Sequence, residues 1–183
     1  MQGTRVDRRK RIIFEVVSII LIATLIVVDQ LTKRYFSTTI EKGNDIVIIE
    51  NFFYFTFTIN TGAAWSFLTN VSWSQIFFKV ITVVALALFA MFYLYAAKKG
   101  FKWLRFAIIF VISGTVGNFI DRLAINGVID FIGFIFWGYN FPIFNLADSF
   151  LVVGVIMMII HFFFFDDNAV FKSKNGNEEV SNK

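Results

Sequence analysis

The pattern of apolar residues along the chain predicts a membrane protein with four transmembrane helices. A bilayer core about 30 Å thick requires roughly 20 consecutive, mostly apolar residues of helix. Four stretches meet this requirement, at residues 12–28, 76–97, 104–120 and 144–165. Polar residues interrupt each stretch at few positions, so we expect an all-α membrane fold with a single domain over residues 1–165.

One segment between the first two spans has a different period. In residues 53–60, FYFTFTIN, apolar and polar side chains alternate strictly, and the residue types are aromatic or β-branched. This period of two predicts a β-strand, and residues 46–49 are a plausible partner with a turn near Glu50 and Asn51. We therefore expect a small extracytoplasmic sheet, or cradle, over about residues 46–66, with its aromatic face on the membrane surface.

Composition agrees with lipid as the solvent and removes several kinds of chemistry. Hydrophobic residues make up 57% of the chain and charged residues 16%, whereas soluble domains are about half apolar and about a quarter charged. The chain has no cysteine, which excludes disulfides, thiol nucleophiles and Cys-ligated metals. His161 is the single histidine, so neither a His-based metal site nor a Ser-His triad is available, and we interpret it as structural.

The basic residues predict the orientation in the membrane. They concentrate before the first span, between the second and third spans, and after the fourth, while the other two links carry fewer. By the positive-inside rule both termini are cytoplasmic, and the sheet lies outside the cell. The net charge of +4 is explained by this topology rather than by a nucleic-acid partner. The first span lacks a small-residue cleavage site and is expected to be retained, and the polar tail at 166–183 is predicted to be disordered.

Polar residues gather at the outward ends of the predicted spans. An ionisable group inside a transmembrane helix costs at least about 2.5 kcal/mol at the helix centre, so it needs a reason. Asp29 is expected to end the first helix, and Asp130 lies in the link between the third and fourth. The full set is Asp29, Asn118, Asp121, Arg122, Asp130, Asn145 and Asp148.

Taken singly, these residues have simpler interpretations. Asp29 and Lys33 are spaced as an i,i+4 ion pair. Asp121 and its neighbouring arginine could neutralise one another at the interface, and Asn145 with Asp148 resembles a capping box. None of these interpretations explains why all of the residues lie at one depth.

Asp130 and Asp148 are the candidates for acid–base chemistry. The link around Asp130, residues 127–133, is otherwise apolar and is expected to fold back against the membrane, which would desolvate the carboxyl group and raise its pKa. If it meets Asp148, the two carboxyl groups share one site and cannot both ionise easily. One then holds a proton while the other acts as a base, as in aspartic proteases.

Five short motifs resemble those of the lipoprotein signal peptidase family, and they occur in the family's order from the first span to the fourth. They are DQLTK at 29–33, NTGAAW at 60–65, GNFIDR at 117–122, VIDF at 128–131 and FNLAD at 144–148. One departure is Ser113, where the family often has a second glycine. Because serine is also small, we expect helix packing to tolerate it.

The resemblance implies an intramembrane aspartic endopeptidase of the bacterial plasma membrane with Asp130 and Asp148 as its catalytic pair. Its expected substrates are diacylglyceryl-modified prolipoproteins, cut just before the lipidated cysteine, and it is expected to act as a monomer among membrane lipids with no cofactor or metal. It further implies a structural or surface role for Asp29 and Lys33. The residues that it places around the substrate are Asn60, Gly62, Asn118, Asp121, Arg122 and Asn145.

Two alternatives remain open from the sequence. A transporter or channel would use intramembrane acids to relay protons or bind cations, but it would favour polar residues at several depths. A Ser-Lys peptidase could use Lys33 with Ser37 at helical spacing, which would leave both candidate acids unexplained.

Overall fold

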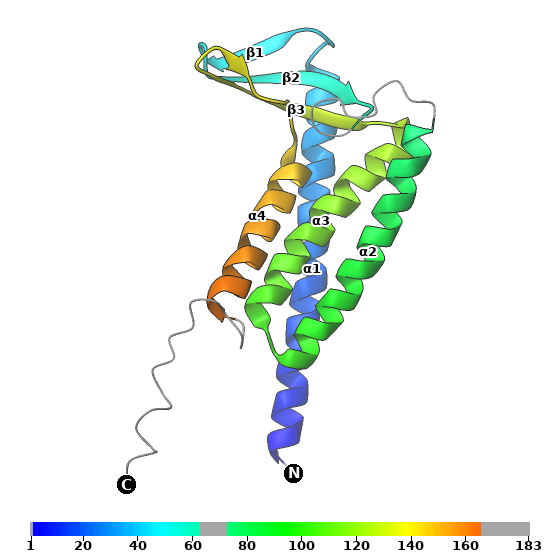
Figure 1. Ribbon diagram of the computed structural model, residues 1–183, viewed down its shortest axis with the longest axis vertical. Coiled ribbons are helices and arrows are strands. Elements are labelled where there is room, and N and C mark those ends of the chain that lie inside the picture. The colour runs from blue at the N-terminus through cyan, green and yellow to red at the C-terminus, as the bar shows by residue number, and fades with distance from the viewer. Residues whose placement is uncertain (1, 63–72, 166–183) are drawn as a thin grey trace.

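The computed structural model describes residues 2–62 and 73–165 and contains the four predicted helices (Figure 1). They are α1 (Gln2–Thr39), α2 (Ser74–Lys99), α3 (Lys102–Ile125) and α4 (Leu146–Ile160), and α4 continues into a π-helical turn, η2 (His161–Phe165). With η2 included, all four are long and apolar enough to cross a membrane. The predicted mainly helical membrane fold is therefore confirmed. The predicted end of the sheet at 63–66 and the tail at 166–183 lie outside the described residues.

The third helix is the central one. Of its most apolar stretch, 56% is buried within the protein, compared with 6–17% for the most apolar stretches of the other three helices. Glycine permits α4 to approach closely, because a Cβ atom on Gly114 would overlap the carbonyl oxygen of Ala147. Ser113 beside it is fully buried, and its hydroxyl donates to the carbonyl oxygen of Ile109 at 2.8 Å. Its polar atom is thus satisfied within its own helix.

The first helix is longer than its apolar stretch, and the expectation that Asp29 ends it is wrong. The helix continues to Thr39, well past Asp29. Beyond the apolar stretch, one side of its last turns packs on the sheet, where the ring of Phe36 stacks on those of Phe55 and Phe131 at 4.5 Å each. Asp29 marks the end of the lipid-compatible sequence, whereas tertiary contacts determine where the helix stops.

The predicted hairpin is present and lies across one end of the helix bundle (Figure 1). It consists of β1 (Asp45–Ile49) and β2 (Phe53–Asn60), which pair antiparallel with Ile46 opposite Phe55. Asn51 in the connecting turn adopts a left-handed conformation with φ of 56°, which asparagine tolerates better than most residues.

The sheet also contains two strands that the sequence did not predict. β3 (Val128–Phe136) and β4 (Tyr139–Asn140) lie between α3 and α4, and the sheet order is β1-β2-β3-β4. The sequence of β3 was expected to be a link folded against the membrane. It is apolar at nearly every position, so it lacks the period of two that identifies a half-buried strand. Pairing with β2 places Thr58 opposite Asp130.

Candidate active site

Asp130 is held in β3 by two side-chain amides. Its Oδ2 accepts from Asn60 Nδ2 at 3.1 Å, and its Oδ1 accepts from Asn145 Nδ2 at 2.6 Å. The residue is only 3% exposed. Burial raises the pKa of Asp130 to about 7, and the negative charge of Asp148 acts in the same direction. The two amide hydrogen bonds and the positive charge of Lys33 lower the pKa and only partly offset this rise.

Asp148 occupies the first turn of α4, where Asn145 is the N-cap. The Asn145 side chain accepts from the backbone N–H of Asp148 at 3.0 Å, and Asp148 Oδ2 accepts from the backbone N–H of Asn145 at 3.1 Å. The predicted capping box is therefore confirmed. Asp148 also has a second interaction, because its Oδ1 accepts a hydrogen bond from Asn118 Nδ2 at 2.7 Å.

Two asparagines connect the acids. Asn145 Nδ2, which donates to Asp130, also lies 3.1 Å from Asn118 Oδ1, and Asn118 donates to Asp148. Each of the four carboxyl oxygens thus accepts at least one hydrogen bond from an asparagine. A carboxylate oxygen has more than one acceptor position, so these bonds leave room for a shared proton or a water molecule.

The acids face a groove with a volume of about 1080 Å³. Apolar side chains from Ile143, Phe144 and Val152 form part of its wall. Arg122 lies 5.4 Å above the ring of Phe78, and its Nη1 is 3.4 Å from the carbonyl oxygen of Asn118. The groove therefore combines apolar wall residues with polar groups that include both acids. The predicted site residues among its lining are Asn60, Gly62, Asn118, Arg122, Asp130 and Asp148.

Asp121 and Asn145 are not part of this lining. Both are buried, with 5% and 0% exposure. Asn145 lies between the acids, and Asp121 lies in a second polar cluster behind them. The structure therefore places these two residues where they support the acids, and a direct contact with substrate stays a prediction.

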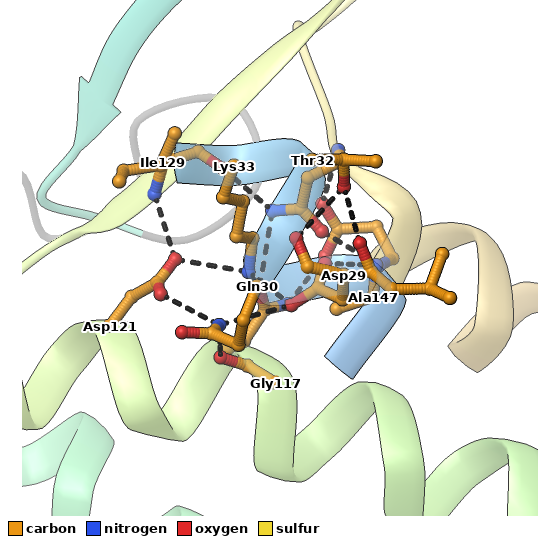
Figure 2. Close-up of polar contacts among 12 residues, drawn as sticks. Asp29, Gln30, Thr32, Lys33, Gly117, Asp121, Ile129 and Ala147 are labelled. Carbon is orange, nitrogen blue, oxygen red and sulfur yellow. Dashed lines mark hydrogen bonds and ion pairs between the residues drawn. The ribbon is translucent and has the colours of Figure 1, made fainter. Parts of the chain in front are cut away.

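The second cluster surrounds Lys33 and is shown in Figure 2. The Lys33 Nζ lies 3.0 Å from Asp29 Oδ2, 3.0 Å from Asp121 Oδ2 and 2.9 Å from Asn118 Oδ1. Asp29 and Lys33 form the predicted i,i+4 pair, but they are 0% and 1% exposed, so neither lies at the surface. An ammonium group has three donors, and here each has an acceptor.

Gln30 belongs to the same cluster and was not among the predicted site residues. Its Nε2 lies within hydrogen-bonding distance of Asp29 Oδ2, the carbonyl oxygen of Gly117 and Asp121 Oδ1, at 3.2, 3.1 and 3.0 Å. The available signal was its position between Asp29 and Lys33 in the first motif. Gly117 has a steric reason to be glycine, because a Cβ atom there would lie 2.6 Å from Asp29 Oδ2.

Other chemical groups are less well placed. Ser37 Oγ donates to the carbonyl oxygen of Arg34 in its own helix at 3.1 Å, whereas the amine of Lys33 is surrounded by the acceptors described above. Within residues 2–62 and 73–165, no three His, Cys, Asp or Glu side chains are grouped as a metal site would require.

Comparison with known proteins establishes the family. A family model described as signal peptidase (SPase) II matches residues 21–164. The chain belongs to the signal peptidase II family. A curated relative, the lipoprotein signal peptidase of Staphylococcus haemolyticus (strain JCSC1435), is 40% identical over 144 residues, which cover 79% of this chain and 89% of the relative. Family membership makes this chain a peptidase.

Solved structures support the same fold. Two of them, described as bacterial membrane enzyme structures obtained by the in meso method at 2.3 and 1.9 Å resolution, are each 38% identical with a TM-score of 0.70. The alignments cover 79% of this chain and 85% and 90% of the two solved chains. The fold described above is therefore shared with these two bacterial membrane enzymes.

Proposed function

We propose that this signal peptidase II removes signal peptides from diacylglyceryl-modified prolipoproteins by aspartic catalysis at Asp130 and Asp148. The observation that carries the proposal is that both acids line one groove and are joined through Asn118 and Asn145. The family supports the removal of signal peptides from prolipoproteins, and the name of the Staphylococcus relative refers to the same activity.

In this mechanism the pair shares one proton. The deprotonated carboxylate takes a proton from water, and the resulting nucleophile attacks the scissile carbonyl carbon. The protonated carboxyl group donates to the carbonyl oxygen, and a proton then passes to the leaving amine. The raised pKa of Asp130 supports this scheme, because it keeps a proton on the pair near neutral pH. The two acids titrate as a unit, so we assign the resting proton to the pair.

The groove suggests how the substrate binds. Its apolar wall would accommodate the signal helix and lipid, and its polar floor would contact the peptide backbone. We assign Asn60, Gly62, Asn118 and Arg122 to substrate contact and Asp121 and Asn145 to support of the acids. The scissile bond would lie just before the lipidated cysteine.

The proposed orientation follows the basic residues. The end of the bundle opposite the sheet carries Lys98, Lys99 and Lys102, which favours the cytoplasm. The sheet and the groove then face the outside of the plasma membrane, where a lipid-modified substrate can enter sideways from the bilayer. We propose that the enzyme acts as a monomer.

A transporter is less compatible with the distribution of polar groups. The clusters around Asp130 and Lys33 lie at the sheet end, and another cluster around Arg105 lies toward the other end. Between them α3 contributes the apolar Ala107, Ile108 and Ile109, each 0% exposed, and the hydroxyl of the buried Ser113 is bonded to a carbonyl oxygen of its own helix. A proton path would require polar groups at these depths.

Cleavage by purified variants in detergent tests the proposal. Asp130→Asn and Asp148→Asn retain size but cannot exchange the proton, so we expect kcat to fall about 100- to 10,000-fold while the proteins stay folded. Asp45→Asn is the matched control, because it makes the same chemical change on an exposed strand, and it should cleave like wild type.

Two substrates separate chemistry from specificity. A diacylglyceryl-modified prolipoprotein should be cleaved, and the same polypeptide without the lipid should not. Near-normal activity in either Asn variant would refute the aspartic pair. Equal cleavage of both substrates would refute the lipid requirement and leave the pair intact.

A further inference from the structure

Two backbone N–H groups are held by acids outside the catalytic pair. The N–H of Ala147 donates to Asp29 Oδ1 at 2.9 Å, and the N–H of Ile129 donates to Asp121 Oδ2 at 3.1 Å. Ala147 immediately precedes Asp148 in the chain, and Ile129 immediately precedes Asp130. Each buried acid of the second cluster therefore fixes the backbone one residue before one catalytic acid.

Lys33 joins these two attachments. Its Nζ lies 3.0 Å from a carboxylate oxygen of Asp29 and 3.0 Å from one of Asp121 (Figure 2). The amide of Gln30 connects the same two acids from another side. A third contact of Lys33, to Asn118 Oδ1, leaves the Nδ2 of that amide directed at Asp148.

The cost of this arrangement argues against a purely stabilising role. Burying charges is expensive, and replacing a buried ion pair by apolar residues of similar volume is often neutral or stabilising. Here one basic side chain is buried with two acidic ones, so the acids of the cluster outnumber its bases. A helix contact alone would be served by one acid, or by none.

We propose that Asp29, Lys33 and Asp121 form a clamp that sets the spacing and orientation of Asp130 and Asp148, with Lys33 as its positioning residue. The clamp links α1, α3, α4 and β3 at the points that determine where the two carboxyl groups lie. This inference rests on the proposed function and names the residues that arrange its site. Misplacement of a catalytic group by about 1 Å can cost on the order of 100-fold in rate, so the clamp should act on kcat.

A charge-matched double variant tests the clamp. Lys33→Met with Asp29→Asn removes one positive and one negative charge, so the net charge of the cluster does not change. The new amide oxygen can still accept from the Ala147 N–H, but the bridge to Asp121 is lost. We expect kcat to fall about 10- to 100-fold while KM for a lipid-modified prolipoprotein stays within about threefold.

Arg105→Met is the matched control for lost stability. Arg105 is a buried cation that pairs with Glu15 of α1 at 2.7 Å, far along α3 from the acids. Its replacement should lower the unfolding temperature without lowering kcat. If the double variant does not fold, Gln30→Leu removes the second bridge without a change of charge, and we expect it to lower kcat about 3- to 10-fold.

The outcomes separate the clamp from the peptidase assignment. A folded double variant with wild-type kcat would overturn the clamp, while the results for Asp130→Asn and Asp148→Asn would stand. The same kcat loss in Arg105→Met would also overturn it, because the effect would then come from general destabilisation. A kcat loss confined to the Lys33 cluster supports it.

Discussion

Two ion-pair clusters connect α1 to α3, one toward each end of the bundle, and they differ in composition. Toward the end away from the sheet, Arg105 pairs with Glu15 at 2.7 Å. The hydroxyl of Tyr93 donates a hydrogen bond to Glu15 at 2.8 Å and accepts one from Arg105 at 2.7 Å. Lys33 at the sheet end has two carboxylate partners. The first cluster matches one cation to one acid, and the second contains an additional acid.

The clusters also differ in what they hold. Glu15 is 36% exposed and its partners are side chains. The role of the Arg105 cluster is therefore to hold the helices together. In the Lys33 cluster the acids are 0% and 5% exposed and accept from backbone N–H groups of α4 and β3. Two buried acids with backbone contacts beside Asp130 and Asp148 fit the proposed positioning role, whereas a balanced, partly exposed pair fits a structural one.

Among the substitutions that test this contrast between the two clusters, we expect glycine substitutions to have the largest effect. Gly117→Ala would place a Cβ atom 2.6 Å from Asp29 Oδ2, which displaces an acid of the clamp. We expect kcat to fall about 100-fold. Gly154→Ala would instead crowd Val111 Cγ2 at 2.6 Å, farther from the acids, and should cost about 1–3 kcal/mol in unfolding free energy with unchanged kcat. Equal effects of the two variants on kcat would break the contrast.

An intermediate effect is expected from pH. The pKa of Asp130 is raised to about 7 in the folded protein, so the folded state binds its proton more tightly than the unfolded state does. This contribution to stability is present at low pH and is lost as pH rises toward about 7. The shared proton leaves over the same range, so kcat/KM should fall about tenfold per pH unit above it.

Both effects can be checked by measuring the unfolding temperature and kcat/KM between about pH 4 and about pH 9. This range includes the ordinary pKa of an aspartic acid and the raised pKa of Asp130. Arg105→Met should lower the unfolding temperature at every pH and leave the activity profile in place. An activity that stays constant throughout the alkaline range would contradict a protonated catalytic carboxyl group.

The smallest effect is expected at Ser37. Its hydroxyl donates to the carbonyl oxygen of Arg34, a bond that stays within one helix. Ser37→Ala should change neither kcat nor the unfolding temperature measurably, since substitutions away from functional contacts are usually within about 0.5 kcal/mol. Loss of activity on this substitution alone would revive the Ser-Lys mechanism and assign Lys33 to chemistry instead of positioning.

The helices and the first hairpin could be predicted because their signals are local. Length and apolarity decide whether a segment can cross a bilayer, and a strict period of two identified β2. The same reasoning failed for β3, because a strand that is apolar at nearly every position has no alternation to read. It also placed the end of α1 at Asp29, since nothing local shows that Phe36 will be covered by Phe55 and Phe131.

The sequence by itself determined which residue types gather at one end of the bundle, because charged and amide groups stand out in apolar spans. Only the tertiary structure separated them into groove residues and supporting residues. Asp121 and Asp130 look alike as acids near helix ends, yet one accepts the N–H of Ile129 and the other lines the groove. The direction in which each of these side chains points depends on how α1, α3, α4 and β3 pack against one another. This packing includes contacts between residues up to 118 positions apart, which no local pattern in the sequence encodes.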